Sequence, residues 1–457
     1  MQTKKDYHGL IGSNVELDRD KAYILYVGDV KYIDTSTFLS DTLSKRYGKP
    51  VEIINVLSNT PPPDMRGNFI VINTELSDYI SRNGEGNYYL PLDEAEINKD
   101  VSSNVYLKKI IDQILKHQDD VFINLFKSTP EMTLADGERV RVIGPDSNLF
   151  SDFDNKAYQR QLIEDLQIPV PTGYVANGFG QLIKLYQENF QDGEAYVVSS
   201  NSFAGNGSEM ISNLDDIIHS DKLRGKNEFV IMKLLDLVAS PSSQGIVSDD
   251  QVMIVSITDQ IMEGVNYKGT IFPSKAGEQK MNQINEYTKK IGDFLRGKDY
   301  RGFFGVDYMI DEEDKLYFTE INPRKTGPSP EIMSAHQLAY PHMPSLAELE
   351  FLAVTEGNFG GDDLSTYQMP NVHWGVYSLT AKKGQRTVNY LPVQRKEEEV
   401  FRESGNTILD HPGEGRIYLN NGRLARIVCV ADDSIYRNPR KEILKRLEEK
   451  ETKIKVA

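Results

Sequence analysis

The chain has 457 residues, of which 39% are hydrophobic and 26% are charged, which is ordinary for a folded globular protein. This length is too great for one hydrophobic core and predicts about two to four subdomains. With 52 basic and 68 acidic residues the net charge is −16. Because no run of Lys or Arg stands out, we do not expect a nucleic-acid partner.

The one cysteine, Cys429, lies in the apolar run RIVCVAD and is expected to be a buried strand residue. A single cysteine excludes an intrachain disulfide and requires no oxidising compartment. The stretch MQTKKDYHGLIG lacks the apolar core of a signal peptide. No run approaches the ~20 apolar residues of a spanning helix. We therefore expect a cytoplasmic protein without a membrane partner.

Residues 1–143 alternate strand and helix signals, which predicts an α/β domain with a mainly parallel sheet. The predicted strands are AYILYVGDV, VEIINVL, NFIVINT and VFINLF, and the predicted helices are TSTFLSDTLSKRYG and NVYLKKIIDQILKHQ. The first strand is followed by VGDVKY and not by the glycine pattern of dinucleotide-binding domains. We therefore place no cofactor phosphates in this domain.

Residues 144–350 are predicted to form the central domain. RVRVIGPDSN closes the first sheet, and a helix follows in FDNKAYQRQLIEDLQIPVP. Strands around AYVVSS and EFVIMKLL mark a subdomain at about 172–236, and β structure covers 245–275. The helix GEQKMNQINEYTKKIGDFLRG then leads to two further strands. Residues 351–457, β-rich with a charged C-terminal helix, are expected to be a small separate domain.

The stretch YFTEINPRKTG, residues 317–327, is the most informative part of the chain. It places Glu320, Asn322 and Arg324 at alternate positions and breaks at Pro323. Side chains of a strand alternate between faces, so Glu320 and Asn322 point the same way. Two oxygen-bearing side chains and a guanidinium thus meet where the strand ends.

The preceding strand, FFGVDYMI, brings a third candidate, Asp307. If a two-residue turn at residues 312–313 joins the strands, Asp307 lies opposite Phe318 and diagonal to Glu320. A three-residue turn would instead place Asp307 on the other face. Two carboxylates and an amide oxygen suit Mg²⁺, or alternatively Mn²⁺. The competing interpretation is a solvated strand edge, but unpaired carboxylates among apolar residues are costly.

The pair GVDYMI…FTEINPRKTG resembles the metal-binding strands of the ATP-grasp superfamily, whose signature is an acid followed by E-x-N-x-R. The resemblance implies an α/β (α+β) ATP-grasp fold with a Rossmann-like pre-ATP-grasp domain and a small β-rich C-terminal domain. It implies that Asp307, Glu320 and Asn322 hold Mg²⁺ on the ATP phosphates. It also implies that Arg324 stabilises the transferred phosphoryl group.

Other segments resemble the same family in the same order. Lys156 matches the helix lysine that points at the ATP phosphates, and a surface lysine is the alternative. AYVVSSNSFAGNGSEM resembles the glycine-rich hairpin that closes over the triphosphate, which implicates Gly205, Asn206 and Gly207. One departure stands out, because Ser199 lies where many members carry a phosphate-binding lysine.

The segment FVIMKLLD resembles the hinge strand beside adenine. The resemblance implies that the Lys233 and Leu235 backbones pair with the adenine edge and that Asp236 accepts from a ribose hydroxyl. A plain buried strand is the alternative. Arg301, before the metal strand, is a further candidate, either for holding a substrate carboxylate in catalysis or as a surface residue.

Nearly the whole chain resembles a narrower group, the peptide ligases of pheganomycin type. This resemblance implies an ATP-dependent carboxylate–amine ligase that forms an acylphosphate from an amino acid or peptide and joins it to an amine in natural-product or antibiotic biosynthesis. Many relatives pair, so a homodimer is expected. The alternatives are a carboxylase-like or kinase-like use of the same core, and an ATP-binding module without turnover. The departure at Ser199 favours the last alternative, and the intact carboxylate set opposes it.

Overall fold

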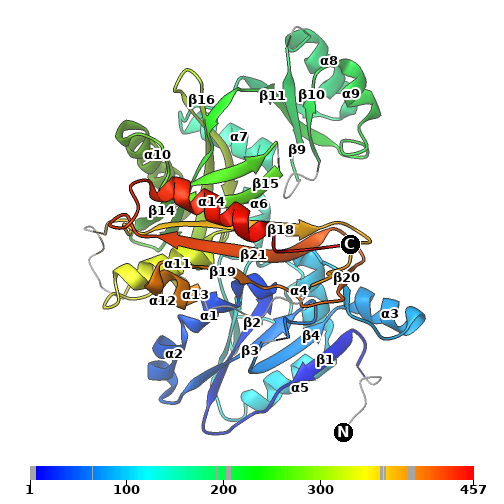
Figure 1. The fold of residues 1–457 in the computed structure, drawn as a ribbon, viewed down its shortest axis with the longest axis vertical. Coiled ribbons are helices and arrows are strands. Elements are labelled where there is room, and N and C mark those ends of the chain that lie inside the picture. Colours follow the sequence, from blue (N-terminus) through cyan, green and yellow to red (C-terminus); the bar gives the residue numbers. More distant parts are fainter. Residues whose placement is uncertain are drawn as a thin grey trace.

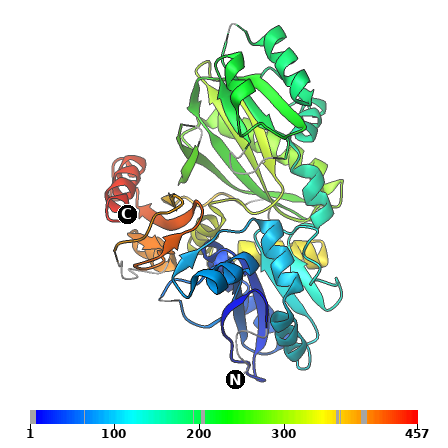
Figure 2. The ribbon, with the colours of Figure 1, turned by 90° about the vertical axis from the view of Figure 1, so that its right-hand side faces the viewer.

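The structure is a computed structural model that describes residues 7–63, 65–191, 193–201, 207–264, 266–360, 364, 367–389 and 397–457. Three of the sheets lie along the length of the molecule, with the six-stranded N-terminal sheet at the bottom, a four-stranded sheet at the top and a nine-stranded sheet between them (Figures 1 and 2). The described helices include none that is long and apolar enough to cross a membrane.

The N-terminal sheet has six strands in the order β1-β4-β3-β2-β6-β7. Only β1 runs antiparallel to its neighbour; the other pairs are parallel. The strands are β1 (Leu10–Asn14), β2 (Ala22–Gly28), β3 (Val51–Leu57), β4 (Asn68–Ile72), β6 (Val121–Leu125) and β7 (Val140–Ile143). The helices are α1 (Ile33–Thr37), α2 (Ser40–Tyr47), α3 (Thr74–Asn83), α4 (Glu94–Ser103) and α5 (Val105–Ile114).

The order in which the chain adds parallel strands to this sheet changes direction between β2 and β6. Strand order runs outward from β2 through β3 on one side and through β6 on the other. The carboxyl ends of β2 and β6 therefore flank a topological switch point, which is where open α/β sheets form a crevice. The short 3₁₀ helix η2 (Val30–Tyr32) follows β2 directly, and Asp29 caps it by accepting from the Lys31 backbone.

The four-stranded sheet is antiparallel, in the order β10-β9-β11-β8, and has α8 and α9 packed on it. Its strands and helices are β8 (Gly173–Asn177), α8 (Phe179–Asn189), β9 (Ala195–Ser199), β10 (Ser208–Ile211), α9 (Leu214–His219) and β11 (Glu228–Lys233). The helices α6 (Ser147–Phe153) and α7 (Lys156–Asp165) lead into it.

The largest sheet has nine strands, in the order β12-β16-β13-β14-β15-β18-β21-β19, with β17 beside β16. Its first strands are β12 (Leu237–Ala239), β13 (Pro241–Val247), β14 (Val252–Glu263), β15 (Asn266–Phe272), β16 (Gly302–Asp311) and β17 (Leu316–Asn322). The helix α10 (Glu278–Arg296) packs on β13 and β14, as the amphipathic pattern predicts. The predicted α/β class is confirmed.

The C-terminal strands differ from the prediction. β18 (His373–Ala381) pairs with β15, and β21 (Gly422–Ala431) and β19 (Asn406–Leu409) continue the same sheet. Moreover, α12 (Leu346–Glu356) runs across the predicted boundary between residues 350 and 351. Residues 351–457 thus extend the central sheet, which a division by composition does not reveal. The other helices here are α11 (Ser329–Ala339), α13 (Glu397–Glu403) and α14 (Pro439–Glu451).

The C-terminal part also contacts the N-terminal domain. β20 (Ile417–Tyr418) pairs with β5 (Tyr88–Tyr89) in a two-stranded parallel sheet. The aromatic rings of Tyr89 and Tyr418 lie 4.9 Å apart. Cys429 on β21 is fully buried, as predicted, and burial raises the pKa of its thiol to about 11. The thiol is therefore a packed core group.

Candidate active site

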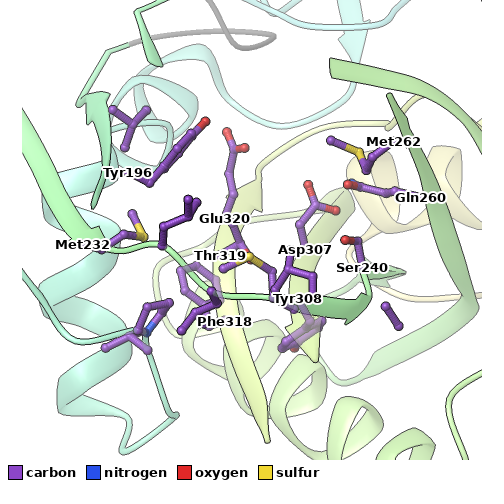
Figure 3. Close-up of a pocket in the computed structure, with 18 of the residues that line it drawn as sticks. Tyr196, Met232, Ser240, Gln260, Met262, Asp307, Tyr308, Phe318, Thr319 and Glu320 are labelled. Atoms are coloured by element: carbon purple, nitrogen blue, oxygen red, sulfur yellow. The ribbon is translucent and has the colours of Figure 1, made fainter. Parts of the chain in front are cut away.

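A cavity of about 530 Å³ lies between the four-stranded and the nine-stranded sheets. Its wall is largely apolar and comes from both sheets, a composition typical of small-molecule sites. The apolar lining includes Val198, Val230, Met232, Leu237, Met309 and Phe318. Asp307 and Glu320 reach into the same space, with Tyr196 and Met232 on one side and Gln260 and Met262 on the other (Figure 3).

The hairpin of β16 and β17 sets the acidic groups. The backbone of Asp311 donates to Lys315, so three residues form the turn, with Asp314 in the left-handed region at φ 58°. The predicted two-residue turn, and with it Asp307 opposite Phe318, is wrong. A bulge between Asp307 and Tyr308 then shifts the register by one residue. The pairing of β16 with β17 therefore brings Asp307 directly opposite Glu320.

The carboxylate of Asp307 is electrostatically unusual. Burial, followed by the negative charge of Glu320, raises the pKa of Asp307 to about 6. Hydrogen bonds from Ser242 and Asn322, and the charge of Arg324, oppose this rise. Asn322 Nδ2 donates to Asp307 Oδ2 at 3.0 Å. The structure thus brings the three predicted metal ligands together.

The chemistry of this donor set fits a divalent cation. Asp307 and Glu320 are like charges on facing strand positions, which is destabilising unless a cation lies between them. Two carboxylates and an amide are hard oxygen ligands, which leave coordination positions for water and phosphate oxygens, as Mg²⁺ prefers. In the part of the chain that the structure describes, no group of three or more His, Cys, Asp or Glu forms an alternative metal site.

Lys156 lies beside the carboxylates. Its Nζ is 3.0 Å from Glu320 Oε1, and its side chain is 13% exposed. The position follows from the start of α7, where Asn155 accepts from the backbone of Tyr158 and caps the helix. The Lys156 backbone also donates to Ser200 at the end of β9. A predicted phosphate-binding lysine is thereby anchored at the cavity wall.

Arg324 faces the N-terminal domain. Its guanidinium carbon lies 4.8 Å from the ring centroid of Phe126, which follows β6. The next residue, Lys325, forms an ion pair of 2.5 Å with Glu350 and contacts Asn124 on β6. The loop after β17 is therefore docked against the switch point of the N-terminal sheet.

Two of the remaining predicted residues line the cavity. Lys233 and Leu235 line it, whereas Asp236 is not among its lining residues and accepts a backbone hydrogen bond from Glu312. Gly207 has φ +85° and accepts from the Ser199 backbone. Gly205 and Asn206 lie outside the described residues.

Arg301 does not belong to the site. Its guanidinium forms a two-pronged ion pair with Asp249, at 2.6 and 2.7 Å. It directly precedes β16, six steps along the strand before Asp307, which corresponds to about 20 Å. The interpretation of Arg301 as a carboxylate-binding catalytic group is therefore corrected to a surface ion pair with the turn between β13 and β14.

Sequence reasoning missed three cavity residues. Asp259 is buried on β14 and accepts from the Lys275 backbone and from Arg440 Nη2, both at 2.8 Å. Arg440 begins the C-terminal helix, so α14 reaches the cavity wall. Lys275 lines the cavity as an exposed lysine. No local motif marks these residues, because a contact between β14 and a helix 181 residues later depends on the tertiary fold.

An apolar cavity between two sheets, with paired carboxylates from adjacent strands, is the site that the fold builds in this region. Residues 153–328 match the ATP-grasp domain, so the chain contains an ATP-grasp domain. Over 106 residues the chain is 38% identical to the L-propargylglycine–L-glutamate ligase of Streptantibioticus cattleyicolor, covering 23% of this chain and 22% of that protein. A butirosin acyl-carrier protein–L-glutamate ligase of Niallia circulans is 26% identical over 194 residues, with 40% and 46% covered.

The match thus spans less than half the length of both curated relatives. Among solved structures, a biotin carboxylase–β,γ-ATP complex from Campylobacter jejuni has a TM-score of 0.64 at 12% identity, covering 95% of this chain and 92% of that one. The N5-carboxyaminoimidazole ribonucleotide synthetase of Thermotoga maritima has a TM-score of 0.59 at 14% identity, covering 96% and 99%. At these identities the structures establish that the chain has their fold.

Proposed function

We propose that the protein is an ATP-dependent carboxylate–amine ligase that forms an amide through an acylphosphate, as in the pheganomycin-type peptide ligases. The observation that carries this proposal is the grouping of Asp307, Glu320 and Asn322 beside Lys156, at the edge of an apolar cavity. The relatives support ligation of amino acids, since both are named as L-glutamate ligases, and the first joins L-glutamate to a second amino acid.

The cavity provides separate places for the parts of ATP. The apolar wall between Met232 and Phe318 suits a flat base, and the backbones of Lys233 and Leu235 lie at its edge. The phosphates would then extend toward Lys156 and the carboxylates. Asp307, Glu320 and Asn322 would hold Mg²⁺, which when bound offsets the negative charge of the β- and γ-phosphates.

The protein would position the substrates and offset the negative charge of the phosphates. A substrate carboxylate oxygen attacks the γ-phosphorus, the bond to the β,γ-bridging oxygen breaks, and ADP leaves with an acylphosphate formed. An amine then attacks the acyl carbon, loses a proton, and inorganic phosphate leaves. Lys156 would contact the phosphates, and Arg324 would stabilise the charge of the transferred group. No protein nucleophile is required.

L-Glutamate is our first candidate among amino-acid substrates, because it appears in the names of both relatives. Peptide substrates, a cytoplasmic location, a homodimer and a role in antibiotic biosynthesis remain parts of the proposal. A second candidate function is an ATP-binding module without turnover. It is favoured by Ser199, which is buried at the end of β9 where the family resemblance expects a phosphate-binding lysine.

Product analysis separates these functions. The full chain is incubated with ATP, Mg²⁺ and a pool of L-amino acids that includes L-glutamate, and ADP, phosphate and new masses are measured. ADP together with a new amide supports the ligase. ATP binding without ADP formation in every pool would favour the binding module. A phosphorylated product or a bicarbonate-dependent product would indicate kinase-like or carboxylase-like chemistry.

A further inference from the structure

The loop after β17 contacts the topological switch point of the N-terminal sheet. Lys31 and Tyr32 follow β2, and Phe126 follows β6, so they flank this switch point. Tyr32 and Phe126 stack at 4.4 Å, and Arg324 lies over the Phe126 ring. In open α/β sheets this is the usual place for a ligand. Here the glycine-rich phosphate loop is absent, so a ligand must be held by side chains.

Lys31 is buried at this switch point, and the described residues offer its ammonium no anion within ion-pair distance. It is 2% exposed, and among the described residues its Nζ forms no hydrogen bond or ion pair. Lys31 Nζ lies over the Tyr32 ring, 5.3 Å from the ring centroid. Burying an unpaired charge costs several kcal/mol, about enough to consume much of a domain's stability. Such a group points to a missing anion.

The ammonium is aimed at the reaction loop. A Cβ added to Gly327 would lie 3.7 Å from Lys31 Nζ and 3.0 Å from Tyr267 Oη. Both polar ends therefore converge on a glycine three residues after Arg324, and a side chain there would fill the space between them. Tyr267 also bonds Thr270 at 2.8 Å and is 40% exposed, so part of its side chain is open to solvent.

Two further buried groups have unused polar atoms. Arg423 Nη1 has no hydrogen-bond partner and lies 3.7 Å from Asp29 Oδ1. Glu331 is fully buried; its Oε1 accepts from Arg426 at 2.7 Å, whereas Oε2 has no partner. Both residues act electrostatically on Lys31. The Lys31 ammonium, a guanidinium nitrogen of Arg423 that makes no hydrogen bond, and a carboxylate oxygen of Glu331 that accepts none match the charges of an amino acid, which carries a carboxylate and an ammonium.

We propose that Lys31, with Tyr267 and Arg423, binds a carboxylate of the amino-acid substrate, and that Glu331 accepts from its ammonium. The proposal rests on the proposed ligase function, because it assigns the substrate end that does not react. In a dicarboxylic amino acid such as L-glutamate, the second carboxylate would extend toward Arg324 and the ATP phosphates. The site would select free amino acids with an unblocked carboxylate.

Binding measurements test this without turnover. In the presence of MgADP, calorimetry measures the affinity of the wild-type chain for each L-amino acid, with L-glutamate first, and for the α-amide of each one that binds. Lys31→Met is compared with Lys31→Arg and with Lys45→Met, which alters an exposed lysine on α2. We expect Lys31→Met to bind the acid at least about 10-fold more weakly and to lose the preference for acid over amide.

Lys31→Arg should retain much of the preference, and Lys45→Met all of it. MgADP affinity should remain within about twofold in every variant, which shows that the fold is intact. Equal affinity of wild type and Lys31→Met for the acid would overturn the proposal, as would a wild type that binds no amino acid. Lys31-dependent binding without amide formation would refute the ligase function and leave this site standing. Amide formation that is unaffected by Lys31→Met would support the ligase function and refute the Lys31 site.

Discussion

Asp307 on β16 and Glu320 on β17 face each other directly, as cross-strand partners. Burial, followed by the negative charge of the facing Glu320 carboxylate, raises the pKa of Asp307. The bulge beside Asp307 creates this pairing, so the unfavourable geometry depends on a specific feature of the strand. Lys156 offsets part of this cost at Glu320, and the proposed cation would offset the rest.

Glu320→Gln should abolish most Mg²⁺-dependent turnover while the fold is retained. We expect a loss of about 100-fold or more in kcat, because one of the two carboxylates of the cation site is neutralised. ADP formation at saturating ATP measures it, and circular dichroism checks the fold. Glu312→Gln, on the exposed turn of the same hairpin, is the matched control. Turnover of Glu320→Gln close to wild type would show that the metal assignment is wrong.

Lys156→Met should weaken ATP binding more than it slows the chemical step. The lysine already pairs with Glu320 at the cavity edge, so it is positioned to contact phosphate when ATP enters. We expect KM for ATP to rise about 10-fold or more, from the loss of charge-assisted hydrogen bonds. Lys184→Met on the exposed face of α8 is the control. An unchanged KM would remove Lys156 from the phosphate site.

Lys275 is our candidate for the cation that offsets the departure at Ser199. It lines the cavity, its backbone is fixed by Asp259, and no ion-pair partner of its side chain is found among the described residues. Lys275→Met should therefore raise the dissociation constant for ATP about 10-fold, whereas its effect on ADP should be smaller if it contacts the γ-phosphate. Equal effects on ATP and ADP would place Lys275 away from the γ-phosphate, and no effect would refute the assignment.

Amino-acid affinity should depend on pH through Lys31. Burial, followed by the charge of Arg423, lowers the pKa of Lys31 to about 7. The charged groups around it include Asp29, Tyr32, Tyr267, Glu331, Arg423 and Arg426. Because a carboxylate prefers the ammonium form, affinity should fall up to tenfold per pH unit as the pH rises above about 7. Lys31→Arg should flatten this profile, since arginine stays charged. A profile identical in both proteins would exclude Lys31.

Lys31→Met should also stabilise the ligand-free protein. A lowered lysine pKa means that the folded state disfavours the charged form, so the cost is fully present below about pH 7 and disappears as the pH rises toward 10.5. The variant should therefore melt about 1–3 °C above wild type at pH 6, with the difference shrinking at pH 9. Lower stability of the variant at pH 6 would indicate that Lys31 has a structural role.

Local patterns predicted much of the fold. The segment VEIINVL forms β3 with the predicted bounds, and Gly48 ends α2 in the left-handed conformation. The composition after residue 360 predicted strands correctly but gave no sign that β18 would pair with β15. Strand pairing between distant segments depends on tertiary packing, which alternation along one strand does not encode.

The candidate site was predicted through side-chain type more than through register. The predicted turn length was wrong, yet Asp307 and Glu320 still meet, because the bulge offsets the extra turn residue. Arg301 was misassigned because its partner, Asp249, lies 52 residues away in sequence. The burial of Lys31 also depends on contacts with segments that are distant in sequence. Nothing in VGDVKY shows that its lysine will be buried beside Gly327.

The transfer of carboxylate oxygen to phosphate tests the central claim most directly. The full chain is incubated with MgATP and L-amino acids labelled with ¹⁸O in their carboxyl groups, and mass spectrometry follows the phosphate and the product. An acylphosphate route requires that one carboxylate oxygen leaves with each phosphate, so we predict singly labelled phosphate that accumulates in step with the amide. Unlabelled phosphate formed alongside the amide, or ATP bound without any hydrolysis, would contradict the account.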